Sequence, residues 1–119
     1  MDAINLAEKF KLFDETWHPK VIAQLNNYQV KLVKLEGEFV WHDHADTDEL
    51  FFCVDGEFHI DFRHGSTHIK AGELCVVPKG VEHRPRAQTL CHVLIFETDG
   101  VVNTGNIDSD LQAPVDEWL

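Results

Sequence analysis

The sequence predicts an all-β domain of antiparallel strands, arranged as a sandwich or a barrel and preceded by a short helix. Turn residues interrupt the chain at short intervals, at positions 26–27, 55–56, 64–65, 71–72 and 78–80. Between them lie short runs rich in β-branched and aliphatic residues, which favour strands. Phe58, Ile60 and Phe62 alternate with polar residues, the two-residue period of a strand with one face in water. Together these observations indicate eight or nine short strands.

A helix is expected over about residues 5 to 13, before the first strand. Asn5 has the residue type of an N-cap, and Glu8 stands three positions later, as in a capping box. Phe10 and Phe13 follow at helical spacing and give the helix one apolar face. We expect this face to cover one end of the domain.

The strands follow the turns in chain order. We expect them over residues 21–25, 28–36, 38–44, 49–54, 57–63, 66–70, 73–77, 81–87 and 89–97. After residue 99 the pattern fades into an acidic, polar segment, which we expect to drape over the surface or to be partly disordered. Trp118 in that segment is a candidate for docking on the domain or on a neighbouring subunit. The predicted division is therefore a lead-in over 1–20, a barrel over 21–98 and a tail over 99–119.

Charge and composition exclude several classes of function. Ten lysine and arginine residues against 21 aspartate and glutamate residues give a formal charge of −11. A surface this acidic repels phosphate backbones and anionic lipids, so we expect neither nucleic-acid nor membrane binding. No apolar run approaches membrane-spanning length, and no basic, apolar leader opens the sequence. Three cysteines without a CxxC pair indicate free thiols and a cytoplasmic location.

Three histidines and one glutamate form the candidate site. His42 and His44 are two apart in an extended segment, so their side chains point the same way and can share a metal ion. Glu49 begins the next strand, and an antiparallel return can place its carboxylate beside them. His83 stands at the entry to a later strand. The plain alternative is a set of exposed loop histidines.

The spacing of these residues resembles the two signature motifs of the cupin superfamily. The first motif comprises Gly37, His42, His44, Glu49 and Gly56, with four, one, four and six residues between them. The second comprises Gly72, Pro78, Gly80 and His83, with five, one and two residues between them. The first usually has five residues before its first histidine, and the second usually carries Asn where this chain has Ala87. The resemblance covers about residues 21 to 96. It implies a jelly-roll β-barrel holding one divalent metal ion, with His42, His44, Glu49 and His83 as ligands.

The donor set has its own chemical preference. Three imidazoles and one carboxylate suit Fe(II), Mn(II), Ni(II), Co(II), Cu(II) or Zn(II), and an octahedral ion would keep two positions open for a small molecule. By strand parity, Val40, Phe51 and Cys53 face the same way as the ligands and are candidate pocket residues, with core packing as the alternative for the last two.

The remaining charged and titratable residues carry weaker signals. His92 lies on a strand that is apolar on both faces, so it is only a candidate catalytic group. His59 and His68 fall on the water-facing side of the alternating strand. Arg84 and Arg86 can either steer an anionic substrate or pair with acidic neighbours.

Two classes of function remain open at this point. The family resemblance implies an enzyme acting on a small organic molecule, of dioxygenase or of isomerase or epimerase type, and we favour it. The alternative is a non-catalytic ligand- or metal-binding protein, because the fold alone does not select between them. The segment from Leu50 to Val54 is apolar on both faces and needs a cover on its outer side, which either the N-terminal helix or a second subunit can supply. The resemblance to small cupins, many of which are dimers, leads us to expect a homodimer.

Overall fold

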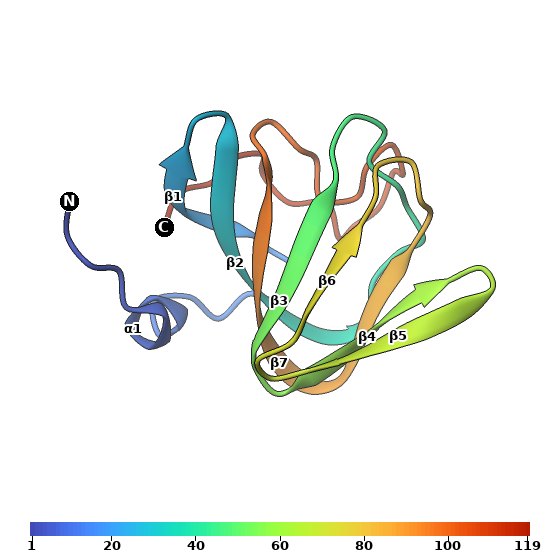
Figure 1. Ribbon diagram of the computed structural model, residues 1–119, viewed down its shortest axis with the longest axis horizontal. Coiled ribbons are helices and arrows are strands. Elements are labelled where there is room, and N and C mark those ends of the chain that lie inside the picture. Colours follow the sequence, from blue (N-terminus) through green and yellow to red (C-terminus); the bar gives the residue numbers. More distant parts are fainter.

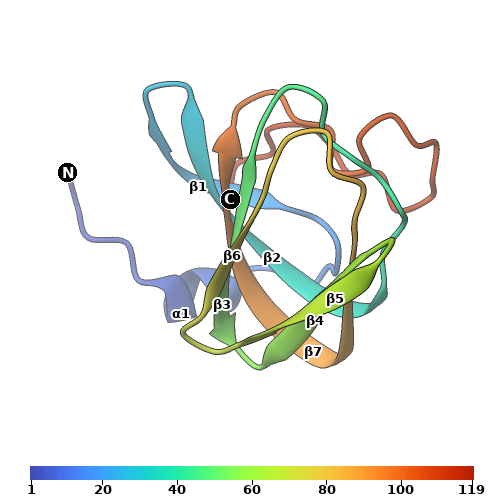
Figure 2. The same cartoon turned by 45° about the vertical axis from the view of Figure 1, so that its right-hand side comes forward.

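Seven antiparallel strands and one short helix make up the computed structural model, which describes residues 1–119. The elements are α1 (Leu6–Phe10), β1 (Lys20–Leu25), β2 (Tyr28–Glu38), β3 (Glu49–Asp55), β4 (Glu57–Phe62), β5 (Gly65–Lys70), β6 (Leu74–Val77) and β7 (Arg84–Thr98). The strands wrap around a common interior, as Figures 1 and 2 show from two directions. The fold is therefore the predicted all-β jelly-roll barrel. With five residues, α1 is too short to span a membrane.

The long strand β7 connects the two layers of the barrel. Its second half lies between β2 and β3 in the order β1-β2-β7-β3-β6, and its first half pairs with β4. Separate strands were expected over 81–87 and 89–97, but the ladder with β2 continues through the bend. A register shift between Leu35 and Gly37 absorbs it. Seven strands therefore replace the eight or nine expected, and residues 38–44 form mostly loop.

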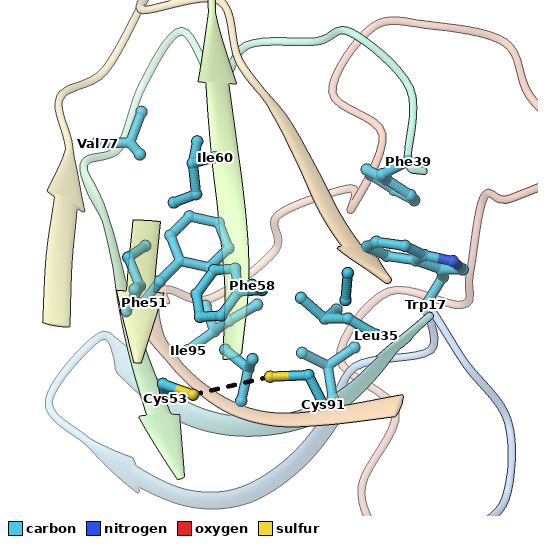
Figure 3. Close-up of a cluster of buried hydrophobic side chains, with 14 residues drawn as sticks. Trp17, Leu35, Phe39, Phe51, Cys53, Phe58, Ile60, Val77, Cys91 and Ile95 are labelled. Carbon is cyan, nitrogen blue, oxygen red and sulfur yellow. Dashed lines mark hydrogen bonds between the residues drawn. The ribbon is translucent and has the colours of Figure 1, made fainter. Parts of the chain in front are cut away.

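The core fills the interior between the layers. Its members come from β2, β3, β4, β5, β6 and β7 and from the loops, and Figure 3 shows them meeting inside the barrel. Trp17 stacks on Phe39 with 4.8 Å between ring centroids, which seals one end of the core. Buried and less buried residues alternate along β3 and along the second half of β7, as the two-residue period predicts.

The helix covers the outer face of β2. The side chain of Asn5 accepts a hydrogen bond from the backbone N–H of Glu8 at 2.9 Å, so the predicted N-cap is confirmed. The helix ends at Phe10, three residues short of the prediction, but Phe13 is still buried beside it. Both rings pack against Leu32, whose side chain points out of the barrel.

The C-terminal segment is tied to the barrel rather than free. The N–H of Val21 donates to the carbonyl of Glu117 at 2.8 Å, and the N–H of Leu119 donates back to Val21 at 3.1 Å. The side chain of Asn103 makes three hydrogen bonds to backbone groups. Gly105 lies so close to the carbonyl of Asp43 that any side chain there would clash. The segment thus braces the loop that carries His42 and His44.

Candidate metal centre

Two loop segments, distant in sequence, are joined at the candidate site by backbone hydrogen bonds. The N–H of His42 donates to the carbonyl of His83 at 3.0 Å, and the N–H of His83 donates to the carbonyl of His42 at 2.9 Å. The N–H of Gly80 donates to the carbonyl of His44 at 2.9 Å. This small bridge aligns the two predicted motifs, so their histidines project into the same space.

The four predicted ligands form one buried cluster. His42, His44, Glu49 and His83 each offer a ligand atom, and these atoms lie within 4.8 Å of one another. The carboxylate Oε1 of Glu49 lies 3.2 Å from Nε2 of His83 and 3.5 Å from Nε2 of His44. The structure therefore brings together all four residues that the motifs singled out.

Backbone carbonyls set the orientation of two of the rings. Nδ1 of His42 lies 2.9 Å from the carbonyl of Val40, and Nδ1 of His83 lies 2.9 Å from the carbonyl of Val81. A carbonyl only accepts, so each Nδ1 carries the proton and donates it, which leaves a lone pair on Nε2. The buried Nε2 of His44 has no hydrogen-bond partner. Lone pairs thus converge on one point, and a divalent cation fits this donor set.

Burial sets the charges of the cluster. It lowers the pKa of His42 to about 4, with a further contribution from His83, and the pKa of His44 to about 3. Burial also lowers the pKa of His83 and raises that of Glu49 to about 7. The imidazoles are consequently neutral near pH 7, which is the form that binds a metal.

A narrow cavity of about 40 Å³ leads from Glu49 into the barrel. Its walls are mainly apolar and include Trp17, Val33, Leu35, Phe39, Phe51 and Ile95. The C-terminal segment adds Val101 and Asn103 to the lining. A molecule in this cavity would lie beside one candidate ligand, Glu49.

Two charged residues that line this cavity were not predicted from the sequence. Lys31 and Glu97 are only 3% and 4% exposed, and Nζ of Lys31 donates to Oε2 of Glu97 at 2.9 Å. Burial and the neighbouring Glu49 raise the pKa of Glu97 well above its usual value. Each charge occupies an inward position among apolar neighbours, Val33 for Lys31 and Ile95 for Glu97. A charged residue on the otherwise apolar face of each strand was the sequence signal that could have identified this pair.

The other candidate pocket residues have different positions. Phe51 lines the cavity, whereas Val40 is half-buried against the core and Cys53 lies deeper, with its Sγ 3.7 Å from that of Cys91 (Figure 3). His92 points out of the barrel, away from the cluster, and stacks on Phe10 with 4.2 Å between ring centroids. The strand is apolar on both faces, so its pattern did not reveal which face was inside.

The two arginines near the site are engaged in ion pairs. Arg84 and Arg86 both contact the carboxylate of Asp61, at 3.0 Å and 2.9 Å. This agrees with the alternative in which they pair with acidic neighbours. His59 and His68 stack on each other outside the barrel, with 4.3 Å between their ring centroids.

Comparison with known proteins places these features in a family. Residues 30–96 match the family model described as the cupin domain. A solved cupin-2 domain protein from Shewanella frigidimarina NCIMB 400 is 54% identical, with a TM-score of 0.79 over 80% of this chain and 93% of that chain. Protein YdbB of Bacillus subtilis (strain 168) is 42% identical over 67 residues, which are 56% of this chain and 59% of that protein.

One more distant structure shares the fold. Hydroquinone 1,2-dioxygenase PnpCD, solved with Cd²⁺ and 4-hydroxybenzonitrile, is 21% identical, with a TM-score of 0.69 over 77% of this chain and 70% of that chain. At this identity the similarity concerns the barrel alone.

Proposed function

The chain belongs to the cupin domain family, and from that premise we propose that it is a metal-dependent enzyme acting on a small organic molecule. One divalent ion, of Fe, Mn, Ni, Co, Cu or Zn, would be held by His42, His44, Glu49 and His83. The observation that carries this proposal is the buried cluster in which three imidazoles and one carboxylate place their ligand atoms within 4.8 Å of one another. Such an ion polarises the oxygen atoms of a bound substrate.

The reaction class we propose is that of a dioxygenase or of an isomerase or epimerase. Four protein ligands leave room for two further donor atoms on an octahedral ion. The apolar cavity walls suit a small, largely apolar substrate. The distant dioxygenase neighbour has the same barrel, which makes this chemistry compatible with the architecture.

The alternative, a non-catalytic metal or ligand carrier, is favoured by the size of the cavity. About 40 Å³ accommodates only a few water-sized groups, so a larger ligand would require the lining to move. The two positions left open on an octahedral ion and the apolar cavity walls favour the enzyme instead.

We further propose a homodimer formed through the outer face of β3 and β6. Leu74 and Val76 are 58% and 50% exposed on β6 and pair with half-buried Phe52 and Leu50 on β3. A second copy of the chain would cover this apolar patch.

The three cysteines are free, which agrees with a cytoplasmic location, and the charge of −11 argues against nucleic-acid partners.

Metal analysis combined with an oxygen-consumption screen tests the proposed function. The purified protein should contain about one divalent ion per chain, and loss of that ion to EDTA should abolish any turnover. Small diols, thiols and keto acids are the substrates to screen, with product analysis for isomerisation. A chain that binds no divalent metal would exclude the proposal, and a metal-loaded chain inactive throughout would favour the carrier.

A further inference from the structure

Lys31 and Glu97 are buried, charged residues in the barrel interior that metal ligation does not require. We propose that Glu97, held in place by Lys31, is a positioning residue that hydrogen-bonds the carboxylate of Glu49 and fixes it as a metal ligand. This inference rests on the proposed metal centre and assigns a role to residues outside the ligand set.

The strand register brings the three side chains together. Ile95 of β7 lies opposite Phe51 of β3 on one side and opposite Lys31 of β2 on the other. Glu49 precedes Phe51 by two residues, and Glu97 follows Ile95 by two. Because the strands are antiparallel, Glu49 and Glu97 occupy facing positions, and both side chains point into the barrel. Glu97 thus lies between Glu49 and the ammonium group of Lys31.

The contacts around Glu97 place it as a link between Lys31 and Glu49. Lys31 donates to its Oε2 at 2.9 Å, while its buried Oε1 receives no hydrogen bond. The carboxyl group of Glu97 faces that of Glu49 across neighbouring strands, and a proton on Oε1 of Glu97 would let it donate to the Glu49 carboxylate. Glu49 in turn lies against Nε2 of His83. One continuous chain of contacts therefore runs from the lysine to the metal cluster.

Stability alone does not account for this arrangement. Burying an ammonium group beside two carboxyl groups is expensive, and apolar residues of similar volume would serve the core as well or better. A carboxylate ligand, in contrast, needs a partner for its orientation. Loss of such a partner typically costs about 10–100-fold in metal affinity.

The matched variants Glu97→Gln and Glu97→Met separate these roles. Both side chains are neutral and of similar length, but only the amide of glutamine can donate to Glu49 and accept from Lys31. The probe is Co(II) alone, whose affinity is measured by competition with a chelator. We expect Glu97→Gln to stay close to the wild type and Glu97→Met to bind about 10–100-fold more weakly. The Co(II) absorption spectrum should change in Glu97→Met, because a loosely held Glu49 alters the coordination.

The outcomes distinguish this inference from the metal centre itself. A wild-type chain that does not bind Co(II) excludes the metal centre and the inference with it. If the wild type binds Co(II), equal affinity in both variants, or equal loss in both, overturns the role of Glu97 alone. Should Glu97→Met not fold, the same comparison is made in a Lys31→Met background, which removes the unpaired ammonium group. In that background, the Glu97→Gln variant must again bind Co(II) more tightly than the Glu97→Met variant.

Discussion

The inner and outer faces of the barrel each carry three histidines, and only the inner set is built to bind a metal. His42, His44 and His83 are buried, with ring centroids 4.4–5.9 Å apart. Backbone carbonyls set the rings of His42 and His83, and Glu49 joins the cluster. The tautomers of His42 and His83 are therefore set by the protein rather than by solvent.

The outer histidines are equally close to their neighbours but differently arranged. His59 and His68 stack face to face at 4.3 Å, and His68 lies 3.0 Å from the exposed Glu57. His92 is stacked on Phe10. Two parallel rings do not aim their nitrogen atoms at one point. Proximity of imidazoles is thus insufficient, and burial, ring orientation and a shared carboxylate make the difference.

The largest expected effect is loss of the metal when an inner histidine is removed. His42→Ala and His83→Ala each delete one of four ligands and should reduce the bound metal from about one ion per chain to a small fraction. His59→Ala and His68→Ala are the matched controls and should retain it. Elemental analysis of the four purified variants is the measurement. A full complement in both inner variants would contradict the assigned ligand set.

The next effect is a metal-dependent gap in melting temperature that closes as the pH falls. The pKa values of His42 and His44, about 4 and 3, lie below the usual 6.5, so the stability they contribute is present above pH 6.5 and declines as the pH falls through the lowered values. Glu49 has the opposite sign, because its raised pKa of about 7 makes its burial costly as the pH rises from about 4.5 to 7. A bound cation removes that cost, and protons displace the cation at low pH.

Melting curves between pH 7.5 and 4, with and without EDTA, measure this gap. We expect it to be largest near pH 7.5 and to vanish toward pH 4. The steepest fall should occur between about pH 6 and 4, since up to three protons replace one ion. A constant gap, or none, would show that the histidines hold no metal coupled to folding.

A smaller effect concerns the apolar outer face. Phe52→Lys places a charge within the proposed dimer patch and should convert a species of about twice 13.6 kDa into a monomer. The same variant should keep its metal, because its side chain points away from the cluster. Sedimentation at several micromolar concentrations decides the oligomeric state. A wild type that stays monomeric as its concentration rises would rule out the dimer.

The smallest effect is expected at His92. His92→Ala removes a stacked ring on the outer face and should lower the free energy of unfolding by about 1 kcal/mol. Metal content should not change, and neither should any catalytic rate found in the screen. Denaturant unfolding and elemental analysis provide the two readouts. A loss of turnover with unchanged stability would restore His92 as a catalytic candidate.

Local patterns in the sequence determined much of this protein. The N-cap at Asn5 and most strand positions follow from residue type and spacing, because capping and the two-residue period act over a few residues. The spacing of His42, His44, Glu49 and His83 predicted a cluster, and the structure brings these residues together. The family resemblance supplied the long-range part of that prediction, since nothing local links the first three to His83.

Only the tertiary structure decided which side of each strand is inside. The segments around His92 and Phe52 are apolar on both faces, so the period gives two faces without naming the inner one. The same ambiguity hid Lys31 and Glu97, which are 66 residues apart and meet only because β2 and β7 are neighbours. For the C-terminal segment the sequence left open whether it drapes over the surface or is partly disordered, and backbone hydrogen bonds to Val21 show that it is held against the barrel. Such contacts depend on which strands pair across the barrel, and hydrophobic pattern alone does not encode that choice.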